Sequence, residues 1–411
     1  MPSLPPSGGY LQAIRDSSRV LCAASGVAIK AEHIKRLLLS PAFLDSFRRV
    51  SQVHGLALPL NFSSNVDELN FLSVLSLLNF ASGFRVPLHA QTSRGAWDSI
   101  RALLFSMYIT STTGEGDLLS AKGLRTIDIS KIAEFMGVSL HVERPHDTIP
   151  GVVVGELGGP LYQLVELIAS VLNETGRILE DTGYPDLGSF VAETLERTRK
   201  LQANDDAAVD FVLETLVRAF PGFRDMSEVN GQPIYCFKKA LFLIHAINIR
   251  FGSISPPPFP IPSTTNIPVF ADNVLPSLLV HLGVIDLSST LSLSGLFPPY
   301  GSEMSLEHLL GSAPASTKAV SGVLKMVPEE GPFVTPSQSY ILRAAAINAC
   351  ELIVKTAQSL DATALGDGGE HLDWISKITL PSLDMWIWAV AKDRPDYRVL
   401  KRFVDRDTVY F

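Results

Sequence analysis

This chain of 411 residues has little of what marks several common classes of protein. Charged residues make up only 18% of it, and its three cysteines, at positions 22, 236 and 350, form no C-x-x-C pair. An odd number of widely spaced cysteines favours reduced, buried thiols, as in an intracellular protein. No apolar run reaches the roughly 20 residues of a membrane span. The N-terminus also lacks the basic start and apolar segment of a secretory signal, so we expect a cytoplasmic location.

The net charge and the missing motifs exclude further classes. A net charge of −8 argues against broad nucleic-acid binding, although a small phosphorylated ligand stays possible. The sequence contains no Walker phosphate loop, no Rossmann glycine fingerprint, no H-E-x-x-H and no G-x-S-x-G. Its nine histidines are scattered and show no metal-ligand spacing. What remains is chemistry that carboxylates and a few polar groups perform without a cofactor or a metal.

Helical periodicity dominates the part of the sequence that can form a core. Hydrophobic residues make up 46% of the chain. They recur at helical spacing in segments 33–39, 68–78, 97–107, 161–179, 187–201, 207–220, 237–249, 340–360 and 383–391. Strand candidates are short and lie at 138–142, 152–154 and 229–235. We therefore predict a mostly α fold with a few short strands.

Glycine- and proline-rich stretches predict where the chain leaves regular structure. Loops are expected at 146–160, at the proline-dense 253–268 and at 362–369. The whole chain, 1–411, is predicted to form one compact domain. Within it, two helical subdomains, about 1–250 and 267–411, can lie around one cleft, joined by the proline-rich loop.

The most informative stretch is residues 267–283, IPVFADNVLPSLLVHLG. Asp272 follows an aromatic and a small residue and precedes a predicted short helix, with Pro276 in its first turn and Gly283 at its end. An acid at that position feels the positive end of the peptide dipoles and tends to stay ionised. Such a carboxylate suits a sugar cation, but on local pattern alone an ordinary helix cap is the simpler interpretation.

Several motifs occur together in one order along the chain. They are LNETGRIL at 172–179, FPGFRD at 220–225, FKKA at 237–240, FADNVLP at 270–276, HLG at 281–283 and RAAAINACEL at 343–352. Leu383-Asp384 and a terminal Tyr410-Phe411 follow. From about His54 onward, the chain resembles the queuosine salvage family, the queuosine 5′-phosphate N-glycosylase/hydrolases.

The resemblance implies a helical fold akin to helix-hairpin-helix DNA glycosylases. It also implies cleavage of the bond between ribose and the base queuine in queuosine 5′-monophosphate. The released queuine would then be exchanged into tRNA by a separate transglycosylase. The implied substrate is a mononucleotide, and no cofactor, metal, membrane or direct nucleic-acid partner is expected.

The resemblance also assigns the reacting and base-binding residues. A 7-deazaguanine base lacks the N7 that an acid would protonate, so acceleration must come largely from a carboxylate beside the sugar cation, and Asp272 is that residue. Whether it attacks covalently or only stabilises charge stays open. Phe270, Asp384, Met385 and His54, together with Asp272, are expected to contact the base. Core packing for Phe270, a helix start for Asp384 and a structural role for His54 are the alternatives.

The remaining matched residues are charged or aromatic. Lys238 is expected to bind the 5′-phosphate; Lys239 stands where the family has arginine, and only one of two adjacent, usually solvated lysines can face a pocket. Arg343 and Glu351, on one helix, are expected to support the pocket through ion pairs. Packing or architectural roles are expected for Asn79, Phe80, Asn173, Glu174, Trp386, Trp388 and Tyr410.

Three departures from the family pattern leave alternatives open. Ala389 stands where the family has an acid, Val274 and Ser277 replace flanking polar residues, and the tail reads FVDRDTVYF. The missing acid keeps a hydrolase for another purine-like base as one alternative. A helical binding protein that has lost catalysis is the other.

Overall fold

The computed structural model describes residues 2–51, 56, 58–114, 116–200, 205–297, 305–314, 328–360 and 372–411. Within them the chain is mostly helical with a few short strands, which confirms the predicted fold class. The likeness to helix-hairpin-helix glycosylases remains a prediction. His54 and the expected loop at 362–369 lie outside the described residues.

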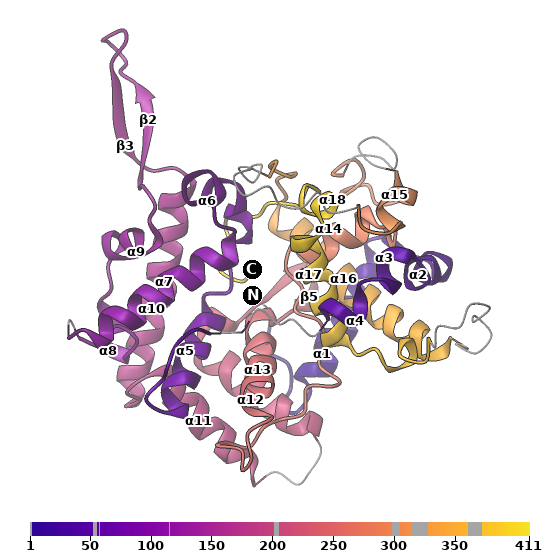
Figure 1. The fold of residues 1–411 in the computed structure, drawn as a ribbon, viewed down its shortest axis with the longest axis horizontal. Coiled ribbons are helices and arrows are strands. Elements are labelled where there is room, and N and C mark those ends of the chain that lie inside the picture. Colours follow the sequence, from indigo (N-terminus) through magenta and orange to yellow (C-terminus); the bar gives the residue numbers. More distant parts are fainter. Residues whose placement is uncertain are drawn as a thin grey trace.

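The described elements are shown in Figure 1. The helices are α1 (Tyr10–Ala24), α2 (Ala31–Leu38), α3 (Pro41–Leu44), α4 (Phe47–Val50), α5 (Asn65–Leu77), α6 (Arg85–Thr92), α7 (Ala96–Thr112), α8 (Ala121–Thr126), α9 (Ile129–Met136), α10 (Pro160–Thr182), α11 (Leu187–Thr198), α12 (Asp205–Ala219), α13 (Lys238–Phe251), α14 (Val274–His281), α15 (Leu306–Leu310), α16 (Pro336–Ser359), α17 (Leu380–Asp393) and α18 (Pro395–Arg398). The strands pair antiparallel, β1 (Ala28–Ile29) with β6 (Ile285–Asp286), β2 (His141–Pro145) with β3 (Val153–Leu157), and β4 (Met226–Val229) with β5 (Gln232–Tyr235).

Each segment predicted from helical spacing overlaps a helix of the structure. The first helix, α1, was not among the predictions, although it buries Tyr10, Leu11, Ile14 and Leu21 on one face. The loop expected at 146–160 is wrong in part, because its second half forms β3. Pairing of β2 with β3 makes a hairpin that projects from the body of the molecule (Figure 1). No single described helix is long and apolar enough to span a membrane; α5 and the segment Ser82–Thr92 pass that test only as a bent pair.

The helices that carry the matched motifs begin at well-formed caps. At the start of α16, the Thr335 side chain accepts a hydrogen bond from the Gln338 backbone while the Gln338 side chain reaches back to Thr335. Thr379 and Ser382 form the same reciprocal pair at the start of α17. Each cap satisfies backbone donors that a helix start leaves without partners. These caps set where the two helices enter the core.

The packing brings distant parts of the chain together. Helix α5 packs against α11 and α13, and α14 packs against both α16 and α17. Helix α1 also packs against α16, so the N-terminal helix lies beside the C-terminal helices rather than with the residues that follow it. The division into subdomains 1–250 and 267–411 remains a prediction, and this contact crosses it.

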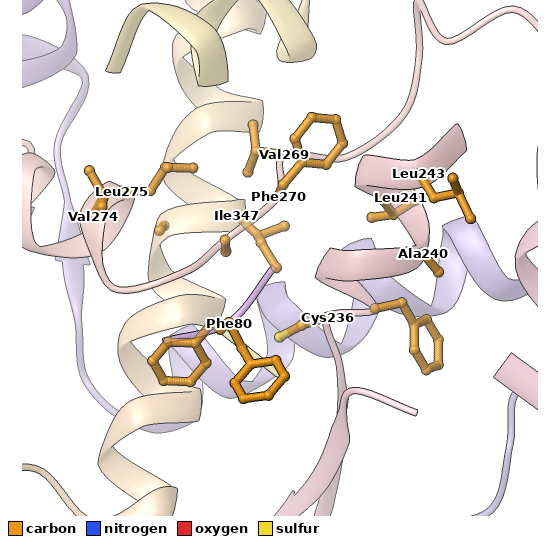
Figure 2. Close-up of a cluster of buried hydrophobic side chains, with 14 of the residues drawn as sticks. Phe80, Cys236, Ala240, Leu241, Leu243, Val269, Phe270, Val274, Leu275 and Ile347 are labelled. Atoms are coloured by element: carbon orange, nitrogen blue, oxygen red, sulfur yellow. The ribbon is translucent and has the colours of Figure 1, made fainter. Parts of the chain in front are cut away.

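Segment 269–275 crosses the hydrophobic core between these helices. Figure 2 shows Val269, Phe270, Val274 and Leu275 on this segment as it passes Ile347 of α16. These side chains are at least nine-tenths buried. Apolar packing therefore holds this segment on both sides of Asp272.

A fully buried ion pair ties this segment to α13 and α16. The Arg343 guanidinium donates to both carboxylate oxygens of Asp225, at 2.9 and 2.5 Å. Arg343 Nε also donates to the Ala271 carbonyl at 2.8 Å, and the Lys238 backbone N–H donates to Asp225 at 3.1 Å. Neither side chain of the pair is exposed to solvent. One pair of charges thus fixes the start of α13 and the residue before Asp272.

Replacing one partner of this pair is expected to lower the unfolding free energy of the protein strongly. Arg343→Met leaves the Asp225 carboxylate buried without its counter-charge, which should cost about 3–5 kcal/mol of unfolding free energy. Arg177→Met is the matched control, because Arg177 pairs with Asp181 on the exposed surface of α10 and should cost less than about 1 kcal/mol. Urea denaturation of the three proteins measures both values. Equal losses in the two variants would show that the buried pair is dispensable.

Candidate active site

Two adjoining cavities lie where α6, α7, α13, α17 and α18 meet. The larger has a volume of about 630 Å³ and the smaller recess about 30 Å³. Both are lined by the same five residues, Asn79, Trp97, Lys238, Asp272 and Trp388. The recess is completed by Phe242, Phe270, Asp384 and Met385. The predicted residues Asp272, Phe270, Asp384, Met385 and Lys238 therefore surround one place in the fold.

Asp272 is both a helix cap and a cavity residue. Its Oδ1 atom accepts hydrogen bonds from the Val274 N–H at 2.7 Å and the Leu275 N–H at 3.4 Å, at the start of α14. Asp272 thus caps this helix, from the position before the N-cap residue Asn273. The side chain is only 5% exposed. No described residue donates a hydrogen bond to its second oxygen, Oδ2. A carboxylate anchored through one oxygen and lining a cavity has its other oxygen available to a ligand.

Asp384 projects from the first turns of α17 toward the same segment. Its Oδ2 atom accepts a hydrogen bond from the Phe270 N–H at 2.7 Å. Burial raises the pKa of Asp384 to about 7, and the nearby Asp272 adds to this, while the Phe270 N–H and Lys238 oppose it. Near neutral pH this acid therefore exists in both protonation states. The alternative interpretation, a surface aspartate at a helix start, is wrong, because Asp384 is 4% exposed.

Aromatic rings form one continuous wall of the recess. The ring centroids of Trp388 and Trp97 lie 6.1 Å apart, those of Trp97 and Phe242 lie 5.6 Å apart, and those of Phe242 and Phe270 lie 5.9 Å apart. Phe270 packs in the core and also lines the recess, so both interpretations of it hold in part. Trp388, expected in the core, instead lines both cavities. A planar base could stack on such a wall.

Lys238 is held at the junction of the two cavities by Asn79. Its Nζ atom donates to the Asn79 backbone carbonyl at 2.6 Å and to the Asn79 side-chain oxygen at 3.1 Å. Burial lowers the pKa of Lys238 to about 8, although the charge of Asp272 opposes this. Asn79 is predicted to pack with a buried amide that needs partners, and in the structure Lys238 is such a partner.

Lys239 points the other way and has a structural role. Its Nζ atom donates to the carbonyls of Leu77 at 2.8 Å and Val409 at 2.6 Å, and it lies over the rings of Phe80 and Tyr410. The side chain is completely buried, so a solvated lysine is the wrong expectation here. As predicted, only Lys238 of this pair lines the cavity.

The two residues predicted to support the pocket, Arg343 and Glu351, lie in different surroundings. Arg343 orients the Ala271 carbonyl and, through Asp225, the start of α13, as described above. Glu351 instead pairs with Arg15 of α1 at 3.0 Å, away from the cavities. Ala389, at the position where the family has an acid, is buried in α17 and lines neither cavity. The structure does not describe His54.

The sequence analysis did not identify the basic residues of the larger cavity. They are Arg49, Arg85, Lys392, Arg398 and Arg402. They come from separate short elements near the two ends of the chain, and no local pattern marks them. Among the described residues, no group of three or more histidine, cysteine, aspartate or glutamate side chains could hold a metal ion.

Comparison with known proteins agrees with this site. Residues 161–294 match the family model described as queuosine salvage protein. The chain is also similar to the queuosine 5′-phosphate N-glycosylase/hydrolase of Bos taurus, with 29% identity over 147 residues. That match covers 35% of this chain and 39% of the bovine protein. The chain is therefore similar to the queuosine salvage family over part of its length, and the segment that matches the family model includes Lys238, Phe270 and Asp272.

The raised pKa of Asp384 predicts how stability changes with pH. The folded protein keeps a proton on Asp384 up to about pH 7, whereas the unfolded chain releases it near its usual value of 3.8. Wild-type stability should therefore fall as the pH rises from 5 to 8, and Asp384→Asn removes this loss. The unfolding free energy of the variant minus that of the wild type should therefore increase by about 2 kcal/mol from pH 5 to pH 8.

Urea denaturation of both proteins at pH 5, 6, 7 and 8 measures the difference. Asp181→Asn, which removes an exposed carboxylate from α10, serves as the control and should change far less. A difference between Asp384→Asn and the wild type that stays constant with pH would contradict a protonated Asp384.

Proposed function

We propose that this protein hydrolyses the N-glycosidic bond of queuosine 5′-monophosphate and releases queuine. The observation that carries the proposal is the placement of Asp272, which lines both cavities with one carboxylate oxygen bonded by no described residue. The family and the name of the bovine relative support the reaction and its substrate class. The released base would be available for exchange into tRNA.

In the proposed reaction, the bond between C1′ and the base nitrogen breaks, and its electron pair leaves with the base. Positive charge then develops on the ribose ring, and the Asp272 carboxylate stabilises it or bonds to C1′. Water supplies the hydroxyl group at C1′ and the proton that the base nitrogen takes up. The products are ribose 5-phosphate and free queuine, so no cofactor is consumed.

The residues that line the recess suit the base side of this substrate, although the recess, at about 30 Å³, has to widen to admit a whole base. Phe270 and the aromatic wall offer a stacking surface, and Asp384 and Met385 lie beside it. Asp384 can hold the base edge as an acceptor when ionised or as a donor when protonated, because its pKa is about 7. Lys238, the predicted phosphate contact, lies next to the reacting centre.

A hydrolase for another purine-like base is the second candidate. Ala389 favours it, because alanine stands where the resemblance places an acid, and Ala389 lines neither cavity. Comparing product formation from queuosine 5′-monophosphate and guanosine 5′-monophosphate separates the two candidates. Thermal stabilisation by queuosine 5′-monophosphate without any product would instead indicate a binding protein.

Asp272→Asn should abolish turnover while leaving binding nearly intact. Asparagine keeps the size of the side chain and can still cap α14, but it removes the negative charge. We expect kcat to fall by about 10²–10³-fold or more, with the affinity for queuosine 5′-monophosphate within a few-fold of wild type. Mass spectrometry of released queuine and isothermal calorimetry measure the two quantities.

Asp186→Asn is the matched control, because Asp186 also caps a helix, α11, through its Oδ1 atom, and it lines neither cavity. It should release queuine at the wild-type rate. Release at the parent rate by Asp272→Asn would refute the assignment of Asp272.

A further inference from the structure

Three arginines from separate elements line one side of the larger cavity. Arg85 lies at the start of α6, Arg398 ends α18, and Arg402 follows four residues later. We propose that this arginine cluster, rather than Lys238, holds the phosphoryl group of the nucleotide. This inference rests on the proposed function and assigns its phosphate subsite.

The cluster has few partners among the residues that the structure describes. No described residue accepts a hydrogen bond from Arg85 Nη2, although this atom is buried. Arg398 forms no ion pair with any described residue, and Arg402 donates to the Ala391 carbonyl at 2.8 Å. Glu330, whose charge acts on Arg85, is already bonded through both carboxylate oxygens to Arg406 Nη2 at 2.9 Å. Several guanidinium donors are therefore left for a ligand.

The three charges also repel one another. Burial, together with the charges of Arg402 and Arg398, lowers the pKa of Arg85 to about 9. The pKa of Arg402 is lowered to about 10 by burial, with Arg398 adding to the effect and Asp272 opposing it. Clustered like charges destabilise the empty protein, and a bound dianion would relieve that repulsion. This is the electrostatic pattern of an anion site.

Lys238 is a poorer phosphate ligand by comparison. Two of its three ammonium protons point to the oxygens of Asn79, and its pKa of about 8 leaves part of the population neutral at cellular pH. Arginine keeps its charge and offers paired donors that match phosphate oxygens. Lys238 has one N–H left beside Asp272, which suits an oxygen of the ribose better than a dianion.

The order of groups along the cavities matches the order of groups in a nucleotide. Asp384, Phe270 and Met385 line only the recess, Asp272 and Lys238 line both cavities, and the arginine cluster lines only the larger one. A base in the recess places the ribose at Asp272 and Lys238. Its 5′-phosphate then extends into the larger cavity, where the arginine cluster lies.

Binding of ribose 5-phosphate and inorganic phosphate tests the cluster without any turnover. Both probes should stabilise the wild type against heat, and ribose 5-phosphate should bind at least 10-fold more weakly to Arg398→Gln and Arg402→Gln. Arg177→Gln, on the exposed surface of α10, should bind like wild type. Lys238→Met should keep its affinity for inorganic phosphate within about 3-fold, because the cluster is intact. Unchanged affinity in the arginine variants, or loss of phosphate binding in Lys238→Met, would overturn the proposal.

Kinetics provide a second readout. In Arg398→Gln and Arg402→Gln, KM for queuosine 5′-monophosphate should rise at least 10-fold with a smaller change in kcat. The preference for the nucleotide over unphosphorylated queuosine should fall by the same factor. Both variants should fold, because each removes one of three repelling charges, and their unliganded melting temperatures check this.

The experiments distinguish failure of the phosphate subsite from failure of the hydrolase assignment. If the wild type forms no product but its ribose 5-phosphate affinity depends on the arginines, the phosphate subsite stands and the hydrolase assignment fails. If the wild type forms queuine and the arginine variants keep the wild-type KM, the subsite fails and the hydrolase assignment stands.

Discussion

The arrangement of the site depends on the buried pair between Asp225 and Arg343. Asp225 accepts hydrogen bonds from the start of α13 and from Arg343 of α16. Arg343 also donates a hydrogen bond to the carbonyl of Ala271. The backbone N–H of Phe237, which has a left-handed conformation with φ 46°, donates to the Asp225 carbonyl. A bulky residue adopts this conformation only where its surroundings enforce it. The pair therefore fixes the backbone from which the side chains of Lys238 and Asp272 extend toward the cavities.

Two carboxylates of the site each make a structural bond through one oxygen and have a second oxygen that no described residue bonds. Asp272 caps α14 through one oxygen, and Asp384 accepts the N–H of Phe270 through one oxygen. Each bond removes rotational freedom from the side chain before a ligand arrives, which lowers the entropic cost of binding. The helix-cap and catalytic interpretations of Asp272 are thus compatible, because the cap supplies the rigidity that a carboxylate beside a sugar cation needs.

Sequence predicted the fold class and the centre of the site, but not its edges. Helical spacing and the capping signals at Asp272, Pro276 and Gly283 are local, so α14 and most of the long helices could be placed. The motif order brought Asp272, Phe270, Asp384 and Lys238 together because each sits inside a continuous motif. The arginine cluster could not be found that way, since Arg85 of α6 and Arg398 of α18 come together only in the folded protein. The Leu-Asn-Phe motif indicates that the Asn79 amide needs a partner, but only the fold shows that Lys238 of α13 is that partner.

The uneven distribution of charge reconciles an acidic chain with an anionic substrate. The protein carries a net charge of −8, which repels long polyanions at a distance. Inside the larger cavity the balance is reversed, because Arg85, Arg398 and Arg402 face few acids. A small nucleotide that enters the cavity comes close to these positive charges. A nucleic acid too large to enter experiences mainly the net negative charge of the protein. The combination favours small anions over long ones, in agreement with the mononucleotide substrate proposed above.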